Sequence, residues 1–330
     1  MSASDVILKY IHAYKFSNVL FTADSLGLFD LMKTERTLEE LCRDTKTNID
    51  SLRIILNFLV YMGCLDKNGT KYILKDDYKE LLVRDTTTSM HELICLESHL
   101  VKTHSSQEYM ERALKYGGED LFNKHSKDGM AQIYGAAMDN GGKIASIYAA
   151  RAFGNIRKGK LLDIGGGPGT YSIQACKFYE GIESTILDLP EMKEVAEENI
   201  RKNNMEGRIS YVSGNIVNDT ISDRYDVVII SNLLHLFNAD TRDIILSKAS
   251  DCLNPNGKLI LHDFFLNDDK TSPEVPILFS LDWMLLGAGF DISKNDLAES
   301  LSSKGFSDVK RIECNMIPTS IIVATKSQEG

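Results

Sequence analysis

The sequence predicts an α/β protein in which a smaller, mostly helical domain precedes a doubly wound parallel sheet. In the second half of the chain, short β-rich runs alternate with helical stretches, and strands joined by right-handed helical crossovers are parallel. In the first 65 residues, apolar residues recur at helical spacing instead. The length of 330 residues and a hydrophobic fraction of 43% supply enough core for both domains. We expect a first domain at 1–90, a helical linker and cover at 91–158, and the sheet domain at 159–330.

The first domain is predicted to have a winged-helix shape. Capping residues at 48–51 precede an apolar helix, and 64–74 reads as two short strands around an Asn-Gly turn. Winged helices often bind DNA, but the candidate recognition helix at 51–62 has only Arg53 as a charge, and 1–90 holds 12 Lys+Arg against 13 Asp+Glu. We therefore expect its apolar surface to bury against a second copy of the chain rather than to contact nucleic acid.

The later elements follow from the same patterns. In the linker, the pairs Gly117-Gly118 and Gly141-Gly142 are expected to interrupt the helices. The expected parallel strands are 160–164, 184–187, 208–212, 226–230 and 257–264, with helices at 191–203 and 240–253 and a closing hairpin formed by 308–313 and 320–325.

Composition excludes several classes of protein. A formal charge of -10 has the wrong sign for coating nucleic acid or an anionic membrane. The best uncharged apolar run, 227–237, is far shorter than the roughly 20 residues needed to span a bilayer. The N-terminus lacks the apolar stretch of a secretory signal, and the six cysteines are scattered without a C-x-x-C pair. We expect a cytoplasmic protein with reduced thiols, no membrane segment and no nucleic-acid partner.

The histidines offer no familiar metal-ligand spacing. His91, His99 and His104 lie close together in the sequence, but a zinc-binding HExxH pattern beginning at His91 would need a second histidine where Cys95 stands. We therefore expect no metal site.

The most informative stretch is LLDIGGGPGTY at 161–171. It reads as an apolar strand with Asp163 near its end, a glycine turn, and a helix that starts near Thr170. Glycine at every second position from 165 to 169 permits a sharp turn and close approach of a ligand, while the helix N-terminus offers free N–H groups. The spacing G-x-G-x-G differs from the dinucleotide fingerprint and from a P-loop. We expect a nucleotide-like ligand here.

Asp188 ends the next predicted strand, within the sequence LDLP. A carboxylate at this position has two oxygens that suit a ribose diol.

These features resemble the class I S-adenosylmethionine-dependent methyltransferases, and within them the small-molecule O-methyltransferases with an N-terminal winged-helix dimerisation domain. The resemblance covers almost the whole chain and implies a Rossmann-like sheet, a homodimer, and S-adenosyl-L-methionine as cofactor with S-adenosyl-L-homocysteine as product. It is carried by LLDIGGGPG at 161–169, LDLP at 187–190, SGNI at 213–216, SNLLHLF at 231–237 and NGKLILHDF at 256–264.

The resemblance implies a set of cofactor residues. The backbone at Gly165 and Gly167 would hold the methionine part, Asp188 the ribose, and Asn215 the adenine. The family usually has Asp at this last position, but an amide oxygen can also accept a hydrogen bond from the adenine amino group. The full implied set is Asp163, Gly165, Gly167, Asp188, Leu189, Asn215, Ile216 and Ser231.

His235 is the histidine with a predicted mechanism. It follows the fourth parallel strand, at the carboxyl edge where open α/β sheets bind ligands, and an imidazole with a reference pKa near 6.5 can take a proton from a hydroxyl. In the resembling enzymes this position is the general base and two acidic residues flank it; the matching residues here are Asp263 and Asp291. The family commonly reads His-Asp-Trp, whereas Leu236 and Phe237 follow His235 here.

The acceptor is expected to be small and hydroxylated. The resemblance implies that Tyr134 and Met138, four residues apart, line the active site, and Trp283 and Met284 belong to an apolar set that suits a flat molecule; core packing is the alternative for both pairs. We predict an O-methyltransferase acting on an aromatic or polyketide-like compound. Methylation of N, S or C, a non-methylating relative, and a cofactor-sensing winged-helix regulator remain alternatives.

Overall fold

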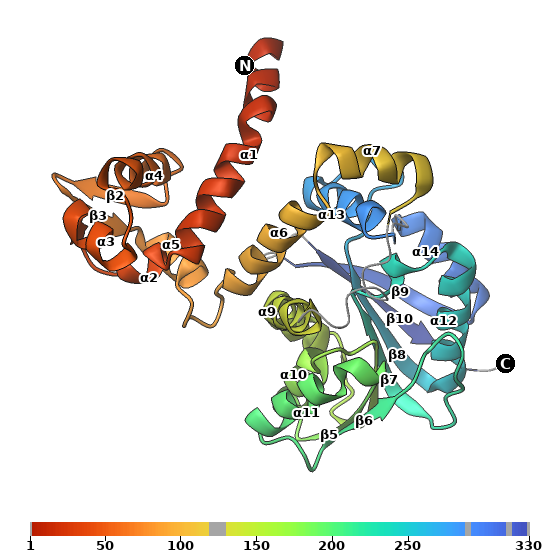
Figure 1. Cartoon of the computed structure of the whole chain (residues 1–330). Helices are drawn as coiled ribbons and strands as arrows, with labels where there is room; N and C mark the ends of the chain where they lie inside the picture. The colour runs from red at the N-terminus through yellow and green to blue at the C-terminus, as the bar shows by residue number, and fades with distance from the viewer. Residues whose placement is uncertain (1, 119–129, 288–291, 315–318, 329–330) are drawn as a thin grey trace. The chain divides into compact units, whose positions relative to one another are not determined.

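The computed structural model describes residues 2–118, 130–287, 292–314 and 319–328, and the chain divides into two compact units, Met1–Lys102 and Thr103–Gly330 (Figure 1). Within the described ranges, no helix combines the length and the apolarity needed to cross a membrane.

The N-terminal unit has the predicted winged-helix arrangement. The side chain of Asn48 caps α4 by accepting hydrogen bonds from the N–H groups of Asp50 and Ser51, at 3.1 and 3.0 Å. The predicted hairpin forms, and a two-residue strand that the sequence did not indicate pairs with its second strand. The elements are α1 (Ala3–Ser25), α2 (Leu28–Leu31), β1 (Arg36–Thr37), α3 (Leu38–Thr45), α4 (Ile49–Tyr61), β2 (Leu65–Asn68), β3 (Lys71–Leu74), α5 (Asp76–Leu82) and α6 (His91–Thr103).

The second unit is built on a seven-stranded sheet of order β6-β5-β4-β7-β8-β10-β9. The first five strands in this order are parallel, and β10 is antiparallel to both of its neighbours. The strands are β4 (Lys158–Ile164), β5 (Gly181–Asp188), β6 (Ile209–Ser213), β7 (Tyr225–Ser231), β8 (Leu253–Asp263), β9 (Phe306–Glu313) and β10 (Ser320–Lys326). This confirms the doubly wound sheet.

Helices cover both faces of this sheet (Figure 1). Val227 and Ile229 of β7 pack with α9, α10 and α11, whereas Val228 and Ile230 pack with α12 and α14, because successive residues of a strand point to opposite faces. Both faces are therefore core. The helices of this unit are α7 (Gln107–Tyr116), α9 (Met130–Arg151), α10 (Thr170–Phe178), α11 (Lys193–Lys202), α12 (Ala239–Cys252), α13 (Glu274–Leu285) and α14 (Lys294–Ser303).

One expected interruption of a helix was wrong. Gly141 and Gly142 lie inside α9 rather than between helices. A Cβ at Gly142 would lie 3.3 Å from the ring of Tyr171 and 3.6 Å from Thr170 Cγ2, so the small residue lets α9 approach α10 closely. Gly117, in contrast, ends α7 with a positive φ of 84°, as expected.

Candidate active site

The glycine loop lies between β4 and α10, at the carboxyl edge of the sheet. Gly165, Gly167 and Gly169 have φ values of 67°, 50° and 83°, a region that strains any residue with a Cβ. Gly165 N–H donates to Leu187 O at 2.8 Å, which ties the loop to the neighbouring strand β5. The three glycines are thus required by backbone conformation, and they leave the loop's surface free of side chains.

Asp188 is held at the end of β5 by backbone donors. Its Oδ2 accepts from Gly167 N–H and its Oδ1 from Leu189 N–H, both at 2.6 Å. Burial raises the pKa of this carboxyl, and the two hydrogen bonds act in the opposite direction. The carboxylate is therefore fixed in position beside the loop and retains lone pairs for a ligand, while Leu189 is 47% exposed.

Asp163 lies beneath the loop and is fully buried. Its Oδ2 accepts from Ser172 Oγ at 2.7 Å and from Ser172 N–H at 3.2 Å, and burial raises its pKa to about 6. A Cβ at Gly166 would come within 2.7 Å of this carboxyl carbon, so the loop passes directly over it. Among the described residues, Oδ1 has no hydrogen-bond partner, and a buried unpaired oxygen is unusual outside functional sites.

The loop after β6 carries the expected adenine residues. Asn215 Oδ1 accepts from Val217 N–H at 2.9 Å, so one lone pair of the amide oxygen is already used. Gly214 N–H donates to Asp188 O at 2.9 Å, which places this loop beside Asp188. Ile216 is buried in the core of the sheet domain.

Ser231, at the end of β7, contributes to a buried cluster around His262. Ser231 Oγ and Tyr171 Oη lie 3.0 and 2.8 Å from His262 Nδ1, and Thr319 Oγ1 lies 2.8 Å from its Nε2. Burial lowers the pKa of His262 to about 4, so it is neutral at neutral pH. The sequence did not indicate this hydroxyl cluster, since its members come from four separate segments.

His235 is paired with Asp263, which is the partner that the family resemblance implies. His235 Nδ1 and Asp263 Oδ1 are 2.7 Å apart, and both side chains are buried. Burial opposes ionisation of Asp263, but the charge and hydrogen bond of His235, together with the N–H of Phe264, outweigh it and lower the pKa of the carboxyl. An ionised Asp263 accepts the Nδ1–H, which leaves the lone pair on Nε2. No described residue hydrogen-bonds to Nε2.

One aromatic ring stacks on the His235 side chain, and two further rings extend from it. The ring of Trp283, on α13, stacks on the imidazole with centroids 4.0 Å apart and planes inclined by 14°. Phe264 contacts Trp283 edge-on and stacks on Phe279 at 4.2 Å. The sequence placed Trp283 in the acceptor pocket but did not indicate that it covers the histidine, and it missed Phe264, whose only signal is its place directly after Asp263.

The two parts of the site are neighbours. The turn that carries His235 follows β7, and β7 pairs with β4 on one side and β8 on the other, with Ser231 opposite His262. A Cβ at Gly165 would lie 2.8 Å from Leu233 Cδ2, so the turn with His235 packs against the glycine loop. The glycine loop and the turn that carries His235 are therefore adjacent.

The remaining predicted site residues are only partly described. Asp291 lies outside the described residues. Tyr134 lies in α9, but its side chain is not described, and Met138 is half-buried on the same helix. Met284 is half-buried on α13. Their roles stay predictions.

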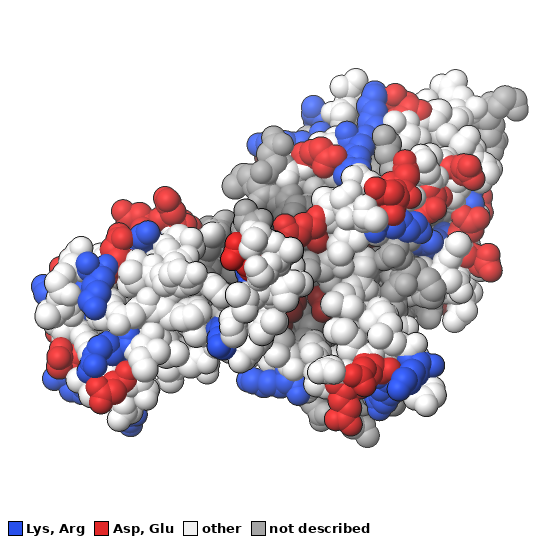
Figure 2. All heavy atoms as spheres, turned by 90° about the horizontal axis from the view of Figure 1, so that it is seen from above, with Lys and Arg blue, Asp and Glu red and all other residues white. Residues whose placement is uncertain are grey.

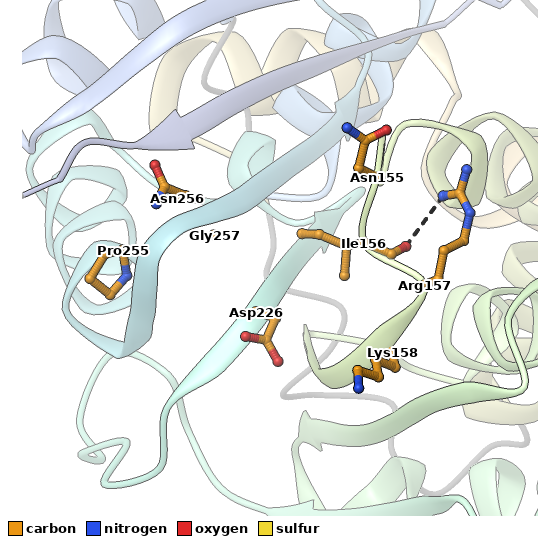
Figure 3. Close-up of a pocket in the computed structure, with 8 residues that line it drawn as sticks. All are labelled: Asn155, Ile156, Arg157, Lys158, Asp226, Pro255, Asn256 and Gly257. Carbon is orange, nitrogen blue, oxygen red and sulfur yellow. Dashed lines mark hydrogen bonds between the residues drawn. The ribbon is translucent and has the colours of Figure 1, made fainter.

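A cavity of about 450 Å³ lies at the opposite edge of the sheet (Figure 3). It is lined by residues near the starts of β4, β7 and β8, including Lys158, Asp226 and Gly257. The Asp226 carboxylate accepts from Lys160 N–H and Asn254 Nδ2, both at 2.9 Å, so it is used to hold these strand starts together. This cavity is therefore separate from the site at the carboxyl edge.

The residues at the carboxyl edge fit S-adenosylmethionine. The glycine loop offers bare backbone, Asp188 offers a fixed carboxylate at the position of a ribose diol, and the unpaired oxygen of Asp163 marks a polar position beneath the loop.

Comparisons with known proteins agree with a methyltransferase that uses this cofactor. The model of the O-methyltransferase domain matches residues 98–307, and that of the O-methyltransferase dimerisation domain matches 8–86. The chain is 24% identical over 318 residues to the tetracenomycin polyketide synthesis 8-O-methyl transferase TcmO of Streptomyces glaucescens, covering 92% of this chain and 91% of that protein. It is 26% identical over 331 residues to the L-tyrosine C(3)-methyltransferase of Streptomyces lavendulae, covering 95% and 90%.

The fold also matches the crystal structure of human N-acetylserotonin methyltransferase in complex with S-adenosylmethionine. The TM-score is 0.84 at 19% identity, with 99% of each chain covered. Sequence, fold and site thus converge, and the chain belongs to the family of S-adenosylmethionine-dependent O-methyltransferases.

Proposed function

We propose that the protein transfers a methyl group to a hydroxyl of a small aromatic or polyketide-like molecule, with His235 as the general base. The observation that carries this proposal is the 2.7 Å contact between His235 Nδ1 and Asp263 Oδ1, in a turn packed against the glycine loop. This contact orients the imidazole so that Nε2 is the proton acceptor.

S-Adenosylmethionine, when bound, supplies a methyl group on a positively charged sulfur. Gly165 and Gly167 offer backbone contacts to its methionine part, and Asp188 orients its ribose. His235 Nε2 removes the proton of the acceptor hydroxyl as the oxygen becomes nucleophilic. The resulting imidazolium is stabilised by the carboxylate of Asp263 and by the face of the Trp283 indole.

The aromatic group beside His235 supports a flat acceptor. Phe264, Phe279 and Trp283 form a continuous set of stacked and edge-on rings, which favours aromatic ligands over aliphatic ones. The relative TcmO is named as an enzyme of polyketide synthesis, which agrees with this class of acceptor. We place Met138 and Met284 at the border of the same pocket, with Tyr134 and Asp291 as further members.

The N-terminal unit supports a homodimer. Ile7, Tyr10, Ile11 and Tyr14 of α1 are between 57% and 67% exposed, which is an unusual number of large apolar side chains for one solvated helix. The match of 8–86 to a dimerisation domain supports burial of this face in a second copy. Light scattering at micromolar concentration tests this proposal, since a monomer would contradict it.

All six cysteines are free thiols. Four of them are buried and two are half-buried, and such unpaired thiols agree with the expectation of a reducing compartment such as the cytoplasm.

A second candidate is methylation at carbon or nitrogen. Leu236 stands where the family commonly has an aspartate next to the base, and a relative with 26% identity is named as a C(3)-methyltransferase. A regulator that senses the cofactor has less support, because positive and negative side chains are interspersed on the face of the N-terminal unit that Figure 2 shows.

The test is a turnover screen with methyl-labelled S-adenosylmethionine and a panel of phenols, anilines and polyketide-like aromatics. We expect methylated phenols, with the position of the new group read by NMR, and loss of turnover in His235→Ala with unchanged cofactor affinity. Methyl transfer to carbon or nitrogen alone would replace the O-methyl proposal by the second candidate. Salt-dependent binding of duplex DNA without turnover would favour the regulator.

A further inference from the structure

Three side chains with metal-binding chemistry converge inside the N-terminal unit. Asp24 lies at the end of α1 and is 3% exposed, while His91 and Cys95 lie on α6 and are partly exposed. Their ligand atoms, a carboxylate oxygen, a ring nitrogen and a sulfur, all lie within 4.8 Å of one another. None of the three belongs to the proposed methyl-transfer site.

The arrangement comes from two helices. His91 and Cys95 are four residues apart, so they share one face of α6. His91 Nδ1 lies 2.9 and 3.0 Å from the two oxygens of Asp24, and Cys95 Sγ lies 3.8 and 3.7 Å from the ring nitrogens Nδ1 and Nε2. Ligands around a tetrahedral zinc ion are separated by about 3.3–3.6 Å, given its bond lengths. Small side-chain rotations would therefore bring the three ligand atoms to the separations found around zinc.

The charges around the three residues also suit a cation. Within the part of the chain that the structure describes, His91 is the only partner of the Asp24 carboxylate. The guanidinium of Arg84 donates to the backbone oxygen of Asp24, not to its carboxylate, and pairs with Asp30 at 3.5 Å.

We propose that Asp24, His91 and Cys95 bind one divalent transition-metal ion of the zinc type, with water as the fourth ligand. Sulfur, nitrogen and oxygen together suit zinc, whereas magnesium and calcium take oxygen ligands. Binding releases the Cys95 thiol proton to solvent, and the proton that His91 Nδ1 shares with Asp24 also leaves this nitrogen, so that its lone pair can hold the ion. The ion clamps the end of α1 to α6. This departs from the expectation of no metal site, which rested on the missing HExxH and C-x-x-C spacings.

The test uses the full chain and zinc alone, in competition with a chromophoric chelator. We expect one equivalent of zinc per chain, and at least tenfold weaker binding in Cys95→Ser and in His91→Ala. Cys42→Ser is the matched control, because Cys42 is a partly exposed cysteine of the same unit whose thiol donates to the Thr47 carbonyl oxygen, and it should bind like the wild type.

Cobalt(II) provides a second readout that does not depend on activity. A cobalt–thiolate bond gives a near-ultraviolet charge-transfer band, which we expect in the wild type and in Cys42→Ser but not in Cys95→Ser. Serine is close in size to cysteine, so this variant keeps the local packing. Equal zinc uptake by wild type and Cys95→Ser, or no cobalt–thiolate band in the wild type, would overturn the proposal and leave a hydrogen-bonded contact between two helices.

Discussion

The proposed site has a cofactor half and an acceptor half, and the two halves depend on different structural features of the chain. The cofactor half depends on backbone: three glycines with positive φ, and two N–H groups that hold Asp188. The acceptor half depends on side chains from three separate elements, in which Asp263 orients His235 and Trp283 covers it. Mutations in the first half should therefore alter cofactor affinity, and mutations in the second half should alter turnover.

The largest expected effect is that of His235→Ala. Loss of a general base lowers turnover by about 10² to 10⁴, and cofactor affinity should stay near that of the wild type because the glycine loop is not changed. Steady-state kinetics and calorimetry measure the two quantities. A parallel loss of cofactor affinity would show that the two halves are not separate.

Asp188→Ala should have the opposite signature. It removes the fixed carboxylate and leaves the N–H groups of Gly167 and Leu189 without acceptors, so affinity for S-adenosylmethionine should fall about 10- to 100-fold. Asp188→Asn keeps one acceptor oxygen and should lose less. Calorimetry that finds unchanged affinity in Asp188→Ala would remove this residue from the cofactor site.

Asp163→Asn tests the buried carboxyl beneath the loop through stability. Its folded-state pKa of about 6 exceeds the unfolded value, so the folded state binds the proton more tightly and the wild type loses stability as the pH rises from 4 to 6. This loss should be about 1–3 kcal/mol in the free energy of unfolding and should be absent in the variant, whose neutral amide does not ionise. Urea unfolding at several pH values measures this loss of stability. The same pH dependence in the wild type and in Asp163→Asn would show that Asp163 is not its source.

Trp283→Leu is expected to have the smallest effect. It removes the aromatic face over the imidazole, so turnover should fall about 3- to 10-fold while cofactor affinity is kept. Trp283→Phe retains an aromatic face and serves as the control. A loss of turnover that is equal in both variants would show that ring size, rather than the face over His235, is what matters.

The two halves also differ in how well the sequence predicted them. The glycine loop and Asp188 lie in short, contiguous motifs. The backbone conformation of such a turn depends mainly on the residues of the turn itself, so a short stretch of sequence predicts it. The pairing of Asp263 with His235 came from a resemblance, and the stacking of Trp283 on His235 depends on how α13 packs, which local patterns do not contain.

Other differences have the same physical origin. Gly141 and Gly142 were expected to break a helix, yet both lie inside α9, and the close packing of α10 against α9 uses the small size of Gly142. The HExxH spacing concerns ligands on one helix, whereas the proposed metal site would combine His91 with Asp24, which lies 67 residues away in the sequence. The two-residue strand β1 is too short to show the alternation of apolar and polar residues by which a strand is recognised in a sequence. Tertiary contacts decide each of these features.

The most direct test of the central claim compares two acceptors of matched shape, one with a hydroxyl that is ionised at the assay pH and one with a hydroxyl that is not. The account predicts that His235→Ala lowers turnover by about 10² or more with the neutral acceptor and only slightly with the ionised one, since deprotonation is then not required of the enzyme. An equal loss with both acceptors would contradict the role of His235 as the general base.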